Sequence, residues 1–132
     1  IINKNMIKDF LIINFTGKNN SIALRTNSKF FIKKFQTNMK NNKLLVNNIF
    51  QFIKQKNAYI NKNFSVIVNV GPGSFSSIRI SLAIGKGIRI SKGVKLYGYN
   101  DADLYKFNRK NIELLIKKNL IENNLIKPVY LS

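Results

Sequence analysis

The stretch from residue 66 to residue 87 constrains the fold most, because it predicts a strand, a tight turn and a helix in immediate succession. Val66 to Val70 is a short, largely β-branched apolar run, which suits a strand buried on both faces. Gly71-Pro72-Gly73 ends this strand, since glycine allows unusual backbone angles and proline lacks a backbone N–H donor. Ser74 is then a suitable N-cap for a helix predicted from Phe75 to Ser91.

The glycine turn has two chemical interpretations. In the first, Gly71-Pro72-Gly73-Ser74 presents backbone amides at a helix start, which makes it a weak candidate site for a phosphate group. In the second, the glycines only allow a tight reversal that packs the helix closely on its sheet. The spacing is not that of a Walker loop, because Gly85-Lys86-Gly87 lies inside the predicted helix and lacks the Ser or Thr that would bind magnesium.

Four further segments predict strands that join the first one in a single sheet. They are Asp9 to Phe15, Ser21 to Arg25, Lys29 to Gln36, and Val94 to Tyr99. Short turns such as Asn27-Ser28 connect the first three segments, which predicts an antiparallel meander. The helix after Ser74 leads to the last segment by a parallel crossover. The sequence therefore predicts an α/β fold with a mixed five-stranded sheet, two main helices and a short helical tail.

The helix predicted from Lys43 to Lys56 is apolar on more than one side. One stripe is formed by Leu45, Ile49, Phe52 and Ile53, and other sides carry Leu44, Val46 and Phe50. Either this whole surface faces a wide core, or one side packs on the sheet and another binds a partner protein. In the helix after the glycine turn, Ser77, Ser81 and Gly85 lie on one line at four-residue spacing. Such small residues allow another helix to approach closely, which predicts tight helix packing.

The composition removes most kinds of catalytic chemistry. The 132 residues include no histidine and no cysteine, so the usual general base and the commonest metal ligands are absent. The five acidic residues do not form a cluster, so we expect neither a catalytic group nor a metal site. These acidic residues are Asp9, Asp101, Asp103, Glu113 and Glu122.

The net charge of +18 has two explanations. A basic surface binds nucleic acid because each neutralised phosphate releases counterions. Alternatively, the abundance of lysine, asparagine and isoleucine reflects the A/T-rich codons of a biased genome. Arginine, which suits bidentate phosphate contacts, is scarce in comparison with lysine. The charge alone leaves both explanations open.

We expect a cytoplasmic protein that does not bind membranes. No stretch reaches the roughly eighteen apolar residues of a membrane span, and no leader has the order of a signal peptide. The chain opens on Ile1, and Met6 comes just before the first strand, so either residue is a candidate for the true start.

The segment after Asn100 carries weaker signals. Asp101 to Phe107 predicts a short helix, and Asn111 to Asn123 predicts a basic one. The apolar face of the basic helix is formed by Ile112, Leu115, Ile116 and Leu120. Residues 127–132 predict an extended segment, since the residue before a proline avoids the helix.

Several of these segments resemble the signature of the TsaB (YeaZ) family, usually written GPGSFTGLRIG and followed by a helix and a strand. The matching residues are Gly71 to Ile80, then Leu82-Ala83, Lys86-Gly87, Gly93-Val94 and Gly98, with Pro128-Val129-Tyr130-Leu131 near the end of the chain. The strong match covers residues 66–99. The resemblance implies one lobe of the actin-like (ASKHA) ATPase fold over residues 1–100.

The resemblance also implies a function. The family helps to make the threonylcarbamoyladenosine modification of tRNA, and its members are regarded as inactive scaffolds for the catalytic paralogue TsaD, joined by the ATPase TsaE. By position, the partner-binding surface would lie on the helices Lys43 to Lys56 and Phe75 to Ser91. The implied contact residues are Leu45, Ile49, Phe52, Ile53, Ser77, Ser81 and Gly85. No cofactor is expected, although ATP at the partner interface is compatible with this role.

Two departures from the family pattern argue against ATP hydrolysis. Asn14-Phe15-Thr16 stands where the family has Asp-Thr-Ser, so an amide replaces the carboxylate that would orient magnesium. Residues 101–132 would form a short tail in place of a second lobe. An RNA-binding module and a degenerate nucleotide-binding domain are the alternative functions, and a homodimer through the same two helices is plausible when TsaD is absent.

Overall fold

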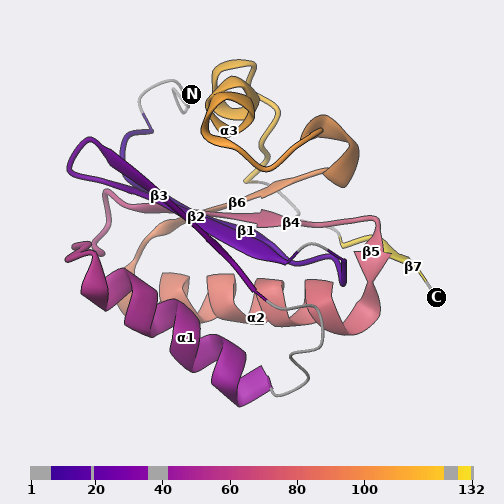
Figure 1. Cartoon of the computed structure of the whole chain (residues 1–132), viewed down its shortest axis with the longest axis horizontal. Coiled ribbons are helices and arrows are strands. Elements are labelled where there is room, and N and C mark those ends of the chain that lie inside the picture. The colour runs from indigo at the N-terminus through magenta and orange to yellow at the C-terminus, as the bar shows by residue number, and fades with distance from the viewer. Residues whose placement is uncertain (1–6, 19, 36–41, 124–127, 132) are drawn as a thin grey trace.

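A mixed five-stranded sheet with helices on both faces forms the centre of the molecule (Figure 1). The computed structural model describes residues 7–18, 20–35, 42–123 and 128–131. The strands of this sheet follow the order β3-β2-β1-β4-β6. Their bounds are Phe10–Asn14 for β1, Ser21–Thr26 for β2, Lys29–Lys34 for β3, Ser65–Asn69 for β4 and Lys95–Tyr99 for β6. The helices are α1 (Asn42–Gln55), α2 (Phe75–Lys92) and α3 (Arg109–Lys117), with a 3₁₀ turn η2 (Asp101–Asp103).

The first three strands form the predicted meander. β1 pairs with β2 and β2 pairs with β3, both in antiparallel register. Asn27 and Ser28 have φ values of 51° and 65°, and two central residues of positive φ match the twist of neighbouring antiparallel strands. The predicted antiparallel meander is therefore confirmed.

The remaining strands of the sheet are parallel, as predicted. β4 pairs with β1 on one side and with β6 on the other. The carboxyl ends of these three strands therefore meet at one edge of the sheet, which is where ligands bind in many open α/β sheets.

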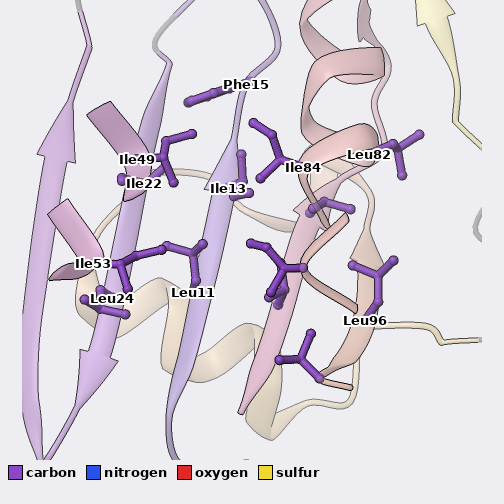
Figure 2. Packing of buried hydrophobic residues seen from close by; sticks show 14 of the residues in the cluster. Leu11, Ile13, Phe15, Ile22, Leu24, Ile49, Ile53, Leu82, Ile84 and Leu96 are labelled. Atoms are coloured by element: carbon purple, nitrogen blue, oxygen red, sulfur yellow. The ribbon is translucent and has the colours of Figure 1, made fainter. Parts of the chain in front are cut away.

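The alternation of side chains along the strands produces two separate cores. Leu11 and Ile13 of β1 face α1 and α2, whereas Phe10 and Ile12 face the opposite side. Figure 2 shows the first core, in which strand residues meet Ile49 and other side chains from α1 and α2. The second core lies under α3 and contains Tyr97, Tyr99, Ile112, Leu115 and Ile116. Both faces of the sheet are thus covered within this chain.

Capping residues define both ends of the helix α2. The Ser74 side chain accepts a hydrogen bond from the Ser77 amide at 3.3 Å, which confirms the predicted N-cap. Gly93 ends the helix with a φ of 70°, and its N–H donates to the carbonyl of Arg89.

The helical elements after Asn100 are shorter than predicted. The first is the short turn η2, and the following helix, α3, ends at Lys117, before the predicted end at Asn123. Asn119 has a φ of 61°, which interrupts the helix, so Leu120 is 39% exposed and does not continue the buried face. Residues 101–123 nevertheless cover the second face of the sheet through α3 and the buried Ile121.

The last described segment forms a two-stranded parallel ladder with the glycine turn. Gly73–Ser74 is β5, and it pairs with β7, Tyr130–Leu131. This agrees with the extended conformation predicted near Pro128. Across the described ranges, none of the helices is both long and apolar enough to span a membrane.

Candidate functional site

The glycine turn is held by hydrogen bonds to other parts of the chain. The Gly71 amide donates to Oδ1 of Asn69 at 2.8 Å, and the Ser74 amide donates to the Thr16 carbonyl at 2.9 Å. The Gly73 amide donates to the carbonyl of Val129 at 3.3 Å. Three amides that could have bound a phosphate are therefore already paired.

Position 71 requires a glycine, because the C-terminal segment passes close to its Cα. Its φ is +102°, a conformation that disfavours other residues, and an added Cβ would collide with the carbonyl oxygen of Val129. A phosphate at the turn would have to displace this segment. The geometry thus favours the structural interpretation of the turn over the phosphate interpretation.

A cluster of polar side chains occupies the carboxyl edge of the parallel strands. Oδ1 of Asn14 accepts from Nδ2 of Asn69 at 2.7 Å and from the Tyr99 hydroxyl at 2.9 Å. The same Asn69 nitrogen donates to Oδ1 of Asp101 at 3.0 Å. Asn69 also accepts from the Gly71 amide, so it links β1, the glycine turn and the segment after β6.

Burial sets the electrostatics of this cluster. Asn69 is fully buried and Tyr99 is 2% exposed. Burial raises the pKa of Tyr99 well above its ordinary value of 10.0, the nearby charge of Asp101 acts in the same direction, and the Asn69 side chain partly opposes both. The tyrosine is consequently neutral at physiological pH.

The cluster does not fit a magnesium-nucleotide site. Asp101 is its only carboxylate, and the position at the end of β1 is the amide of Asn14, which already accepts two hydrogen bonds. Within the described ranges, no three acidic, histidine or cysteine side chains are grouped in a way that could hold a metal ion. Sequence reasoning identified Asn14 but missed Asn69, Tyr99 and Asp101, although all three lie at or just beyond the ends of predicted strands.

The structure corrects the assignment of the α1 residues to a partner-binding surface. Leu45, Ile49, Phe52 and Ile53 are all buried, at 5%, 0%, 6% and 5% exposure, and they belong to the first core. The amphipathic stripe turns toward the sheet because burying it removes the largest apolar area from water. In this fold these side chains are therefore unavailable for direct contact with a partner.

The line of small residues on α2 also faces the sheet. Ser81 is fully buried, and its hydroxyl donates to the Ser77 carbonyl at 3.0 Å. A Cβ at Gly85 would lie 2.8 Å from Cδ1 of Leu96 and 3.3 Å from Cγ1 of Val68. The predicted close approach is real, but the neighbour is β4 and β6 rather than another helix. Ser77 is half-buried near the start of the helix.

An apolar groove of about 310 Å³ lies between α1 and α2 on the side away from the sheet. It is lined by Val46, Phe50, Ala83, Ile84, Gly87, Ile88 and Ser91. Phe50 is 46% exposed, whereas most large apolar side chains of this chain are buried. Among the α1 residues singled out in the sequence whose side chains the structure describes, Val46 and Phe50 line this surface; the side chain of Leu44 lies outside the described ones.

Gly87 has no packing role within the part of the chain that the structure describes. A Cβ at this position would meet no heavy atom within 4 Å. A glycine inside a helix costs about 1 kcal/mol relative to alanine, and here no internal contact explains that cost.

A second hollow lies along α2. This hollow is lined by Phe75, Ser76, Arg79, Ile80 and Ala83, so Ala83 belongs to both. Phe75 is 51% exposed, and the Arg79 guanidinium lies 5.5 Å from the centre of its ring. The outer face of α2 therefore presents apolar side chains in both hollows.

The comparisons with known proteins identify the fold. YeaZ from Pseudomonas aeruginosa matches with a TM-score of 0.65 and 13% identity, over 74% of this chain and 46% of that chain. An uncharacterized protein with similarity to peptidase YEAZ from Pseudomonas aeruginosa matches with a TM-score of 0.63 and 14% identity, over 74% of this chain and 45% of its own. No protein-family model and no curated protein sequence matches the chain. The protein therefore has the actin-like ATPase fold of the YeaZ structures, over slightly less than half of their length.

Proposed function

We propose that this protein is a non-catalytic scaffold subunit of the machinery that makes threonylcarbamoyladenosine in tRNA. The fold shared with YeaZ and the signature-like stretch from Gly71 to Ile80 support this proposal. Its partner is a TsaD-like catalytic subunit, which it binds and stabilises through the outer faces of α1 and α2. A TsaE-like ATPase joins the assembly, and tRNA is held mainly by the catalytic subunit.

The observation that carries the proposal is the apolar groove between α1 and α2. Its lining combines the half-exposed ring of Phe50 with Ala83 and Gly87, whose small size leaves room for a partner side chain. Contiguous apolar patches on a soluble protein commonly mark binding sites for other proteins. The cost of Gly87 is also explained if a partner approaches the helix closely there.

Two further features support a role without chemistry. The sequence has no histidine or cysteine, so the most versatile catalytic side chains are absent. At the carboxyl edge of the sheet, the amide of Asn14 and the paired amides of the glycine turn are poor ligands for magnesium and phosphate. We therefore propose that any ATP in the assembly is bound at the partner interface rather than by this chain alone.

Size-exclusion chromatography with a TsaD-like subunit encoded in the same genome tests the proposal. The expected result is a single complex peak at micromolar concentrations, and two separate peaks would contradict the proposal. Phe50→Glu should abolish the complex, because it places a charge in the apolar groove. Tyr105→Glu is the matched control, since Tyr105 is 87% exposed but belongs to the segment on the other face of the sheet. Circular dichroism should show that both variants keep the fold.

The many exposed cations favour a second candidate, an RNA-binding module. Lys106, Arg109, Lys110, Lys117 and Lys118 are all exposed on and around α3. Titration of labelled tRNA at physiological salt separates the candidates. A module for tRNA should prefer it over random RNA, whereas binding that lacks this preference and disappears with modest salt indicates non-specific charge.

A further inference from the structure

A pocket of about 550 Å³ lies between α3 and the sheet, and we call it the α3 pocket. Figure 1 shows α3 on the opposite side of the sheet from α1 and α2, so this pocket is separate from the groove between those two helices. Its volume falls within the range of about 300–1,000 Å³ that is typical of pockets for small organic ligands. The described residues that line it are Ile7, Phe10, Arg25, Glu113, Ile116 and Lys117.

The apolar part of the lining belongs to the second core. Phe10 is 2% exposed and Ile116 is 7% exposed, and Ile7 packs against the same cluster. An apolar group in the α3 pocket would therefore leave water and contact side chains that are already ordered by the core.

Two arginines hold the surroundings of the pocket in place. Nη1 of Arg25 on β2 donates to the Lys8 carbonyl at 2.6 Å, which fixes the segment that carries Ile7 before β1. The guanidinium of Arg109 lies 5.5 Å from the centre of the Phe30 ring, so it attaches the start of α3 to β3. The α3 pocket is thus formed before a ligand arrives, which lowers the entropic cost of binding.

The charges around the α3 pocket leave one cation without a partner in the described part of the chain. Oε1 of Glu113 accepts a hydrogen bond from Nε of Arg109 at 2.9 Å, and Oδ1 of Asp9 lies 4.0 Å from Nη1 of Arg25. Lys117 makes no ion pair with another described residue, although Glu113 precedes it by one helical turn. The lining therefore combines an available ammonium group with buried apolar side chains.

We propose that the α3 pocket binds a small amphipathic carboxylate, with its apolar body against Phe10 and Ile116 and its carboxylate at Lys117. An ammonium group forms charge-assisted hydrogen bonds with a carboxylate and repels a cation. The carboxylate of Glu113 in the same lining favours a single negative charge on the ligand over the double charge of a phosphate. The inference does not rest on the proposed function, because it concerns the other face of the sheet.

An NMR titration of the isotope-labelled full chain with octanoate tests the proposal. Millimolar octanoate, kept below its micelle concentration, should shift the amide signals of Ile7, Phe10 and Ile116 together, and those of Phe50 and Gly87 should stay in place. Hexanoate should bind about tenfold more weakly, because two fewer methylene groups leave water. Octylammonium has the same tail with the opposite charge, and it should bind more weakly than octanoate.

Charge variants test the role of Lys117. Lys117→Gln should weaken octanoate binding about threefold, as expected for an exposed ion pair. Lys118→Gln is the matched control, since it removes the same charge from the next position, which is exposed and outside the described lining. It should change the affinity much less. Glu113→Gln should strengthen binding, because it removes a negative charge from the lining.

Several results would overturn the proposal. They are the absence of any saturable shift, shifts confined to the groove between α1 and α2, equal binding of octanoate and octylammonium, and equal losses in Lys117→Gln and Lys118→Gln. Circular dichroism checks that the variants keep the fold. If a variant does not fold, the comparison of octanoate with octylammonium on the wild type still decides the question.

Discussion

The substitutions Gly87→Ala and Gly85→Ala should shift the stability of the protein in opposite directions. Both glycines lie inside α2, so both substitutions gain about 0.8–1 kcal/mol from the higher helix propensity of alanine. At Gly87 no described residue opposes this gain, because the added Cβ would meet none of their heavy atoms within 4 Å. We therefore expect Gly87→Ala to stabilise the fold by nearly the full propensity difference.

At Gly85 the same methyl group enters a filled core. Its Cβ would lie 2.8 Å from Cδ1 of Leu96, which is 3% exposed and has little room to move. Cγ1 of the fully buried Val68 is also close, at 3.3 Å. Overpacking of this kind costs about 1–3 kcal/mol. Because the propensity gain is common to both variants, the difference in their unfolding free energies measures this cost directly.

Urea denaturation followed by circular dichroism measures that difference, provided that the m-value is unchanged. A thermal scan should place the melting temperature of Gly87→Ala above that of Gly85→Ala, by about 3–6 °C for each kcal/mol. Equal shifts in the same direction would refute the reasoning, because they would mean that Gly85 and Gly87 have the same surroundings. Such a result would also remove the argument that Gly87 is kept for a contact outside the chain.

Further predictions concern the buried residues. Tyr99→Phe should destabilise the fold by about 1 kcal/mol in urea denaturation, because it removes the hydrogen bond to Asn14. Tyr97→Phe should instead leave the stability unchanged or raise it, because the buried Tyr97 hydroxyl has no hydrogen-bond partner among the described residues. Burial raises the pKa of Tyr99 above its unfolded value, so the stability that the neutral Tyr99 contributes is complete below pH 10.0 and is lost as the pH rises further. The urea midpoint of the wild type should therefore fall above pH 10.0. The midpoint of Tyr99→Phe should fall less steeply over the same range. Ile49→Asp and Ser81→Arg should each unfold the isolated chain, because both positions are fully buried, and folded variants in circular dichroism would contradict the core assignment.

Local sequence patterns account for most of the secondary structure. The apolar run before Gly71, the N-cap at Ser74 and the left-handed Gly93 define the strand and the helix around the turn, and the structure places them within a residue or two of the predicted bounds. The meander is equally local, because the turn at Asn27-Ser28 connects neighbouring strands. These features depend on backbone preferences and on contacts between residues close in sequence, so the amino-acid pattern is sufficient to predict them.

The sequence alone determined the strand, turn and helix around Gly71, the parallel and antiparallel strand pairing, and the scarcity of catalytic side chains. Only the tertiary structure decided which sides of α1 and α2 are buried, so that Ile49 and Gly85 became core residues and Phe50 and Gly87 remained at the surface. Only it joined Asn69 to both Asn14 and Asp101, and closed the glycine turn with the carbonyl of Val129. The physical reason is that the rotation of a helix on a sheet depends on the total apolar area buried by residues distant in sequence, which no local pattern contains.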